Sequence, residues 1–131
     1  MNTATHREFK DRLFGQFARV GKALASPKRL EIVDLLAQGE RTVEEIGRET
    51  SMSVASASQH LQVLKAARMV EARREELYAH YRLADEDVFR TWQAIRALAE
   101  SRLAEVDRMV EAYLVDRGAL EAVDATELME R

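Results

Sequence analysis

The stretch TVEEIGRETSMSVASASQHLQVLKAA, residues 42–67, decides the fold that we expect of this chain. Thr42, with Glu45 three positions later, forms a capping box and predicts a short helix over about 43–49. A turn of three residues follows, and Ser53 then suits the N-cap of a second helix that runs to the end of the stretch. Two helices joined by so short a turn are typical of a helix-turn-helix.

The second of these helices has one apolar side and one small polar side. At the helical spacing of about 100° per residue, the side that we expect to be buried carries Val54, Ala57, Leu61 and Leu64. The opposite side carries Ala55, Ser56, Gln59, Gln62 and Val63, with Ser58 and His60 at its flanks. No charged residue occurs between 50 and 64, although 33% of the chain is charged. Because Ser and Gln can donate to and accept from base edges, this side predicts contact with the major groove of DNA.

A β-hairpin is predicted directly after this helix. Residues 69–74 alternate in polarity and predict a strand, Glu75-Glu76 predicts a turn, and residues 77–83 predict the return strand. A two-residue primed turn is strained without glycine, and none is present here, so we expect a longer or a different turn. The fold class that follows is mainly α with a small β-hairpin, arranged as a winged helix-turn-helix.

Helices are also predicted on both sides of this unit. A first helix over about 7–25 is followed by a second that begins at Ser26-Pro27, and a last helix over about 85–116 is expected to end at Gly118. The first and last helices each have an apolar stripe, which a chain of 131 residues has too little core to bury. We therefore expect them to form the interface of a homodimer, with one extended intramolecular core as the alternative. The candidate interface residues are Phe9, Leu13, Phe17, Trp92, Ile95, Val106 and Tyr113.

Seven residues are candidates for contact with DNA. They are Ser53, Ser56, Ser58, Gln59, His60, Arg73 and Arg74. Ser56 and Gln59 are the base-contacting candidates, whereas Ser53 also suits a helix cap, and Ser58 and His60 also suit structural hydrogen bonds. The two hairpin arginines would contact phosphate or enter the minor groove, with solvated strand charges as the alternative.

The composition argues against several other functions. The chain has no cysteine, and its three histidines do not lie at metal-ligand spacing, so we expect no metal site and no cofactor. No nucleophile–base arrangement or glycine-rich phosphate loop is present, so we do not expect an enzyme. Without a signal peptide or a long apolar run, we expect a cytoplasmic protein that does not enter a membrane. Residues 1–83 carry 14 Lys/Arg and 11 Asp/Glu, whereas residues 84–131 carry 6 and 12, an asymmetry that suits a DNA-binding part.

Several segments together resemble the ArsR/SmtB family of small dimeric bacterial repressors, which leave their operator when an inducer binds. The segments are 24–32, 42–46, 58–64, 70–75 and 81–83. The resemblance covers about residues 12–115 and implies a dimer interface of the first and last helices, with DNA contacted by the polar-sided helix and the wing. The two-fold symmetry of such a dimer would match a palindromic double-stranded DNA operator. The chain is also similar to the amino-terminal part of a subgroup in which this module is fused to a rhodanese-like domain. We accordingly expect a DNA-binding and dimerisation domain over 1–117 and a tail or linker over 118–131.

The chain departs from the metal sensors of this family. Those proteins use cysteines, or paired Asp and His ligands on the last helix, whereas here Asp85 and Asp87 are followed by no histidine. We therefore expect release by an unidentified inducer that is not a thiolate-bound metal. The alternative is a winged-helix module for protein interaction or dimerisation that has no specific DNA binding.

Overall fold

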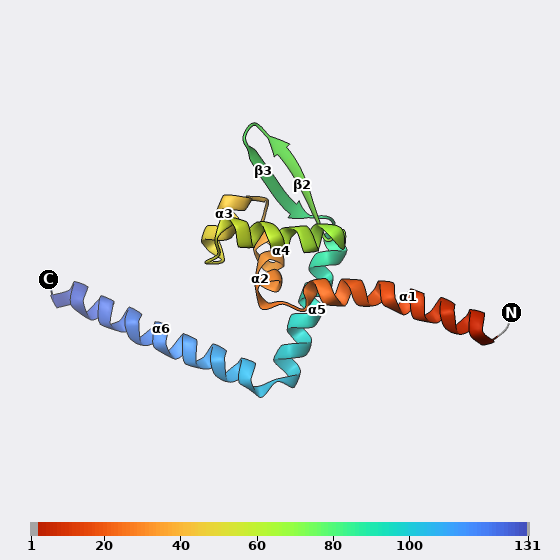
Figure 1. The fold of residues 1–131 in the computed structure, drawn as a ribbon. Helices are drawn as coiled ribbons and strands as arrows, with labels where there is room; N and C mark the ends of the chain where they lie inside the picture. The colour runs from red at the N-terminus through yellow and green to blue at the C-terminus, as the bar shows by residue number, and fades with distance from the viewer. Residues whose placement is uncertain (1–2, 131) are drawn as a thin grey trace. The chain divides into compact units, whose positions relative to one another are not determined.

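The computed structural model describes the backbone of residues 3–130 and the side chains of residues 3–119 (Figure 1). The elements in chain order are α1 (Thr3–Leu24), α2 (Pro27–Ala37), β1 (Arg41–Thr42), α3 (Val43–Glu49), α4 (Val54–Ala66), β2 (Val70–Glu75), β3 (Tyr78–Leu83), α5 (Glu86–Arg102) and α6 (Ala104–Glu130). They form two compact units, Met1–Trp92 and Gln93–Arg131, and the candidate site lies in the first.

Three helices begin where the capping residues predict. The Ser26 side chain accepts from the backbone of Arg29, with proline as the first residue of α2. Thr42 and Glu45 form both hydrogen bonds of the capping box at α3. The hydroxyl of Ser53 accepts from the backbone N–H of Ser56, 3.1 Å away, and caps α4. These starts depend on residues three apart in the chain, which is why the sequence alone predicts them.

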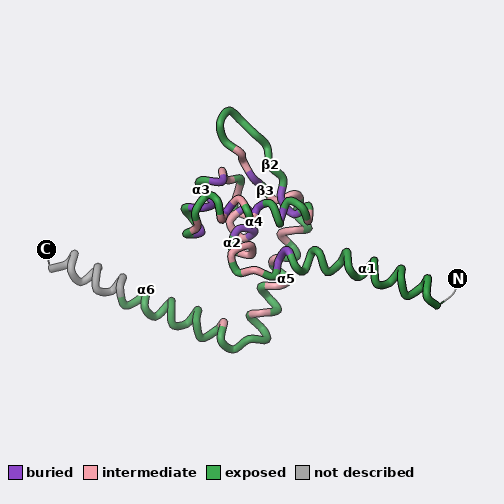
Figure 2. The backbone as a smooth tube through the Cα atoms, viewed as in Figure 1, coloured by how far each residue is buried: buried purple, intermediate pink, exposed green. Residues whose placement is uncertain are grey.

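The core of the first unit lies where α2, α3 and α4 meet the base of the sheet (Figure 2). Its fully buried apolar side chains are Ile32, Val33, Ile46, Ala57, Leu61 and Leu64. Thr50, between α3 and α4, is the polar residue buried in this core, and its hydroxyl donates to the carbonyl of Ile46. This buried hydrogen bond holds the turn between α3 and α4 against the core and so sets the position of α4.

The predicted hairpin is part of a three-stranded antiparallel sheet with the order β1-β3-β2. β2 and β3 pair from Val70↔Leu83 to Glu75↔Tyr78. β1 adds the pair Arg41↔Tyr81 beside the start of α3. The sequence analysis did not predict β1, because a strand of two residues has no periodicity of its own.

Of the two alternatives expected for the hairpin tip, a longer turn or a different one, the longer turn is wrong. Glu75 pairs with Tyr78, so the turn has only two residues, Glu76 and Leu77. Glu76 has a φ of 56°, the positive value that a primed turn requires at its first central residue. A residue with a Cβ in this region costs about 1–2 kcal/mol, which the pairing of two six-residue strands offsets.

The single last helix predicted over 85–116 is also wrong in detail. α5 ends at Arg102 and α6 begins at Ala104, with Leu103 between them outside either helix. Neither proline nor glycine marks this interruption in the sequence. α6 then continues through Gly118, where we expected an end, because glycine inside a helix costs only about 1 kcal/mol relative to alanine.

Large apolar side chains remain exposed on α1 and on the helices that follow the sheet. On α1, Phe9 is 61% exposed, and Phe14 and Phe17 are similar, with their rings packed edge to face. On α6, Met109 and Tyr113 are exposed to the same degree. Among the described residues, no helix is both long enough and apolar enough to cross a membrane.

Candidate nucleic-acid interface

The inner side of α4 is buried almost as predicted. Ala57, Leu61 and Leu64 have no exposed surface and hold the helix against the core. Val54 is 47% exposed and does not belong to this side, contrary to the prediction. Val54 is the first residue of α4 and lies outside the edge of the core. The buried side therefore extends over the last three turns only.

The outer side of α4 is exposed and uncharged. Gln59 is exposed, as are Ala55, Gln62 and Val63 around it. Ser56 is half-buried, and its hydroxyl lies 3.6 Å from the sulfur of Met52, which is a weak acceptor. Gln59 thus keeps its full set of amide donors and acceptors for a ligand, whereas Ser53 is exposed but already engaged as the cap.

His60 forms a hydrogen bond with an arginine of α2. Its Nδ1 lies 3.2 Å from Nη1 of Arg29. A guanidinium only donates, so Nδ1 accepts and the ring proton is on Nε2. Neighbouring Ser58 is half-buried as well. Sequence reasoning missed Arg29 as the partner of His60, because nothing local connects residues 31 positions apart.

The two candidate arginines of the wing differ in their surroundings. Arg73 donates from Nε and Nη2 to both carboxylate oxygens of Glu40, at 2.8 and 3.0 Å, and from Nη1 to Glu75 at 2.6 Å. Hydrogen bonds from this guanidinium lower the pKa of both Glu40 and Glu75. Arg74 is exposed and makes no hydrogen bond or ion pair with the side chains described here. Arg74 is therefore the arginine of this pair that is available to phosphate.

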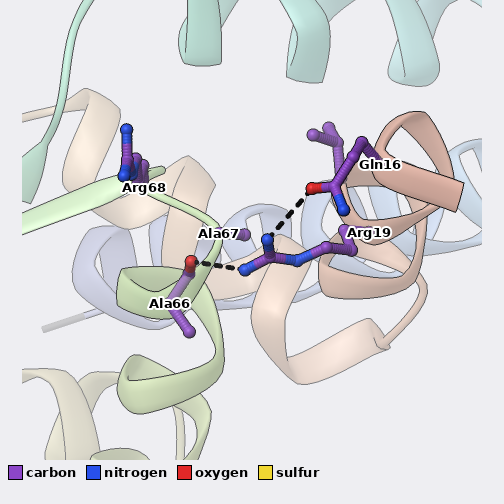
Figure 3. A pocket seen from close by; sticks show the side chains of 6 residues that line it. Gln16, Arg19, Ala66, Ala67 and Arg68 are labelled. Atoms are coloured by element: carbon purple, nitrogen blue, oxygen red, sulfur yellow. Dashed lines mark hydrogen bonds between the residues drawn. The ribbon is translucent and has the colours of Figure 1, made fainter. Parts of the chain in front are cut away.

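The end of α4 is attached to α1 by a second arginine. Arg19 donates from Nη2 to the carbonyl of Ala66 and from Nη1 to Oε1 of Gln16, both at 3.1 Å (Figure 3). A cation at this end also complements the negative end of the helix dipole. α4 is thus held at its first turn by Ser53, in its middle by Arg29 and at its last turn by Arg19.

The candidate dimer residues divide into two groups. Phe9, Phe17 and Tyr113 are well exposed and Leu13 less so, whereas Trp92, Ile95 and Val106 are half-buried. The indole N–H of Trp92 donates to Oδ1 of Asp34 on α2 at 2.8 Å. Trp92 therefore has a structural role within its own chain. Among the described residues, no cluster of three or more His, Cys, Asp or Glu side chains is placed to hold a metal ion.

This geometry agrees with comparisons to known proteins. Residues 26–72, which span α2 through the start of the wing, match the bacterial regulatory proteins of the arsR family. The nodulation protein NolR of Rhizobium meliloti is 31% identical over 97 residues, which cover 74% of this chain and 77% of NolR. The chain belongs to the arsR family. Its fold class, predicted from the sequence as a winged helix-turn-helix, is confirmed for this family member.

Two further relatives of this arsR-family chain are mycobacterial. The HTH-type transcriptional regulator Rv0324 of Mycobacterium tuberculosis is 47% identical over 122 residues, which cover 93% of this chain. The chain spans only 53% of the length of Rv0324. The homodimeric winged helix-turn-helix DNA-binding domain of Mb0332 from Mycobacterium bovis, a possible ArsR-family regulator, is 50% identical. It superposes with a TM-score of 0.68 and covers 73% of this chain and 89% of that domain.

Proposed function

We propose that this arsR-family chain is a sequence-specific repressor that binds a palindromic DNA operator as a homodimer. The observation that carries this proposal is the exposed, uncharged side of α4, centred on Gln59. An ordinary surface helix carries Lys and Glu, whereas DNA-contacting helices need side chains that pair with base edges. The burial of Leu61 and Leu64 behind it supports a rigid helix that can enter a major groove.

Roles follow for the candidate residues around Gln59. Gln59 and Ser56 contact bases, because a glutamine amide suits adenine and a serine hydroxyl suits several bases. Ser53 places the positive end of α4 beside a phosphate while its hydroxyl caps the helix. Ser58 and His60 set the orientation of the helix, and His60 keeps Nε2–H as a donor. At the wing, Arg74 contacts DNA directly, and Arg73 does so only by leaving its carboxylate partners.

The exposed apolar residues support a dimer. Each large apolar side chain that a partner covers contributes about 1.5–3 kcal/mol, so the exposed Phe9 and Phe17 alone favour association. We assign the interface to α1 and to the helices after the sheet, in keeping with the homodimeric state named for the Mb0332 domain. Two-fold symmetry would place two α4 helices about one DNA turn apart, which explains a palindromic operator.

We infer that release depends on an inducer other than a thiolate-bound metal. The chain has no cysteine, so it cannot supply the thiolate ligands themselves. A thermal-shift screen of metals, sulfur species and small organic compounds would find candidate inducers. Each candidate would then be tested for its ability to release the protein from DNA.

A mobility-shift experiment tests the proposal. The probe is the DNA upstream of the gene that encodes this chain, at two salt concentrations. We expect retardation that weakens with salt, and a loss of affinity of about tenfold or more for Gln59→Ala, since a bidentate base contact contributes about 1–3 kcal/mol. Gln38→Ala, which changes an exposed glutamine outside α4 and outside the helices assigned to the dimer, serves as the matched control. Absence of retardation on this DNA would instead favour a protein-interaction module.

A further inference from the structure

Acidic residues are absent from the two segments that contain α4 and most of α1, although the whole chain is acidic. Residues 12–30 and 50–70 together carry seven Lys/Arg and no Asp/Glu, in a protein with a net charge of −3. The second segment contains α4, and the first contains most of α1 and the start of α2. Such a separation of charge favours an anionic partner for the surface that these two segments share.

The two segments meet in a shallow hollow of about 350 Å³, which we call the α1/α4 groove. It is lined by Arg19, Lys22, Ala23, Arg29, Val63, Ala66 and Ala67. A neighbouring hollow shares three of these residues and adds Gln16, Val20 and Arg68 (Figure 3). Among the described residues, none with an acidic side chain lines either hollow. Arg68 also faces a third hollow, lined in part by Asp85 and Asp87, and we leave it out of the site for that reason.

The α1/α4 groove continues the outer side of α4. Val63 and Ala66 lie four and seven positions after Gln59 and therefore on the same side of the helix. Both are exposed and form the α4 wall of the groove. DNA whose bases contact Gln59 would carry its sugar–phosphate backbone past this wall, because the backbone borders the major groove that holds the helix.

The three cationic side chains of the α1/α4 groove differ in how many of their N–H groups remain free to bind an anion. The side chain of Lys22 is exposed and makes no hydrogen bond or ion pair within the part of the chain described here. Arg19 gives two of its five N–H groups to uncharged oxygens, of Gln16 and Ala66, and keeps its charge unneutralised. Arg29 gives three N–H groups to the carbonyls of Ala23 and Lys22 and to His60, so it is a structural residue.

We propose that Lys22, assisted by Arg19, forms a binding site for a backbone phosphate of the DNA held by α4. The site rests on the proposed function and extends it from the helix-turn-helix and wing to the end of α1. A phosphate here would lie between a free ammonium and a guanidinium already positioned by α4 itself. Because phosphate contacts carry no base information, the site would strengthen binding to all sequences alike.

The test is the salt dependence of binding to a labelled duplex of about 30 base pairs and mixed sequence, and to the DNA upstream of the gene. We expect Lys22→Ala to weaken binding to both by roughly three- to tenfold and to lower the slope of log K against log salt by about 0.9 for each phosphate that the protein no longer neutralises. Lys22→Arg retains the charge and should retain the slope. Thermal unfolding should change little, since the exposed Lys22 side chain makes no hydrogen bond or ion pair within the described part of the chain.

Lys10→Ala is the matched control. Lys10 is an exposed lysine of the same helix, about 18 Å from Lys22 along its axis and beyond the Debye length of about 8 Å at physiological salt. An equal effect of the two substitutions would show a response to net charge and overturn the site, as would an unchanged slope for Lys22→Ala. Failure of the wild-type chain to bind either DNA would contradict the proposed function itself, which keeps the two failures distinct.

Discussion

Nη1 of Arg29 lies 3.2 Å from Nδ1 of His60, and the same guanidinium donates to the carbonyls of Ala23 and Lys22 at 2.6 and 3.1 Å. One side chain at the start of α2 thus joins the last turn of α1 to the middle of α4. The last turn of a helix leaves its carbonyls without helical partners; Arg29 satisfies that of Ala23, and it shares that of Lys22 with the backbone N–H of Ala25. Arg29 therefore connects the end of α1 to His60 on the candidate DNA-binding helix.

Arg29→Ala should destabilise the fold strongly. The substitution removes three charge-assisted hydrogen bonds at a half-buried position, and we expect the free energy of unfolding to fall by roughly 2–3 kcal/mol. Urea unfolding at fixed protein concentration measures the change. Arg48→Ala removes an exposed arginine of α3 and should stay within about 0.5 kcal/mol of wild type. Equal stability of the two variants would show that the hydrogen bonds of Arg29 contribute nothing.

Trp92 and Asp34 should prove energetically coupled. Trp92→Phe and Asp34→Ala each break the 2.8 Å hydrogen bond, and a double-mutant cycle should return about 1 kcal/mol of coupling. Because Trp92 is the only tryptophan in the sequence, Asp34→Ala should also shift the maximum of the protein's tryptophan emission. Asp34→Asn keeps an acceptor oxygen and should shift it less. Strictly additive single changes would exclude this hydrogen bond in solution.

Acid should weaken the attachment of the wing to the loop before β1. Hydrogen bonds from Arg73 lower the pKa of Glu40 and of Glu75 in the folded state. A carboxyl group whose pKa is lower in the folded state stabilises the fold at any pH above its unfolded pKa. This stabilisation is lost as the pH falls through the pKa of the folded state. Arg73→Gln should therefore raise the pKa of both carboxyl groups toward the ordinary value, as measured by carbon NMR titration. Unchanged titration of both groups in the variant would contradict the ion pairs.

Substitution of Ser53 should separate its two roles. Ser53→Asp retains a side-chain acceptor for the backbone of Ser56 and suits the positive end of α4, so stability should be kept. Ser53→Ala removes the cap and should cost about 1 kcal/mol. For affinity to DNA we expect the opposite order of the two variants. Because the new carboxylate repels phosphate, Ser53→Asp should bind DNA much more weakly than Ser53→Ala. Tight binding by Ser53→Asp would remove Ser53 from the interface.

Much of the candidate site could be predicted from the residues alone. The polar side of α4 follows from the helical period, so the exposure of Gln59 and the burial of Leu61 needed no tertiary information. A longer hairpin turn, one of the two alternatives that the residues favoured, did not form, because strand pairing outweighed the local cost at Glu76. The interruption at Leu103 carries no proline or glycine that would predict it from the sequence.

The sequence by itself determined the helix starts, the sides of α4 and the winged helix-turn-helix order, because each depends on side chains within one or two turns of one another. Only the tertiary structure decided which charged and polar groups are free. Arg73 meets Glu40 across 33 positions, His60 meets Arg29 across 31, and Trp92 meets Asp34 across 58. Hydrogen bonds and ion pairs act over a few ångströms in space, so a local pattern cannot show that Arg73 is paired while Arg74 and Lys22 remain available to DNA.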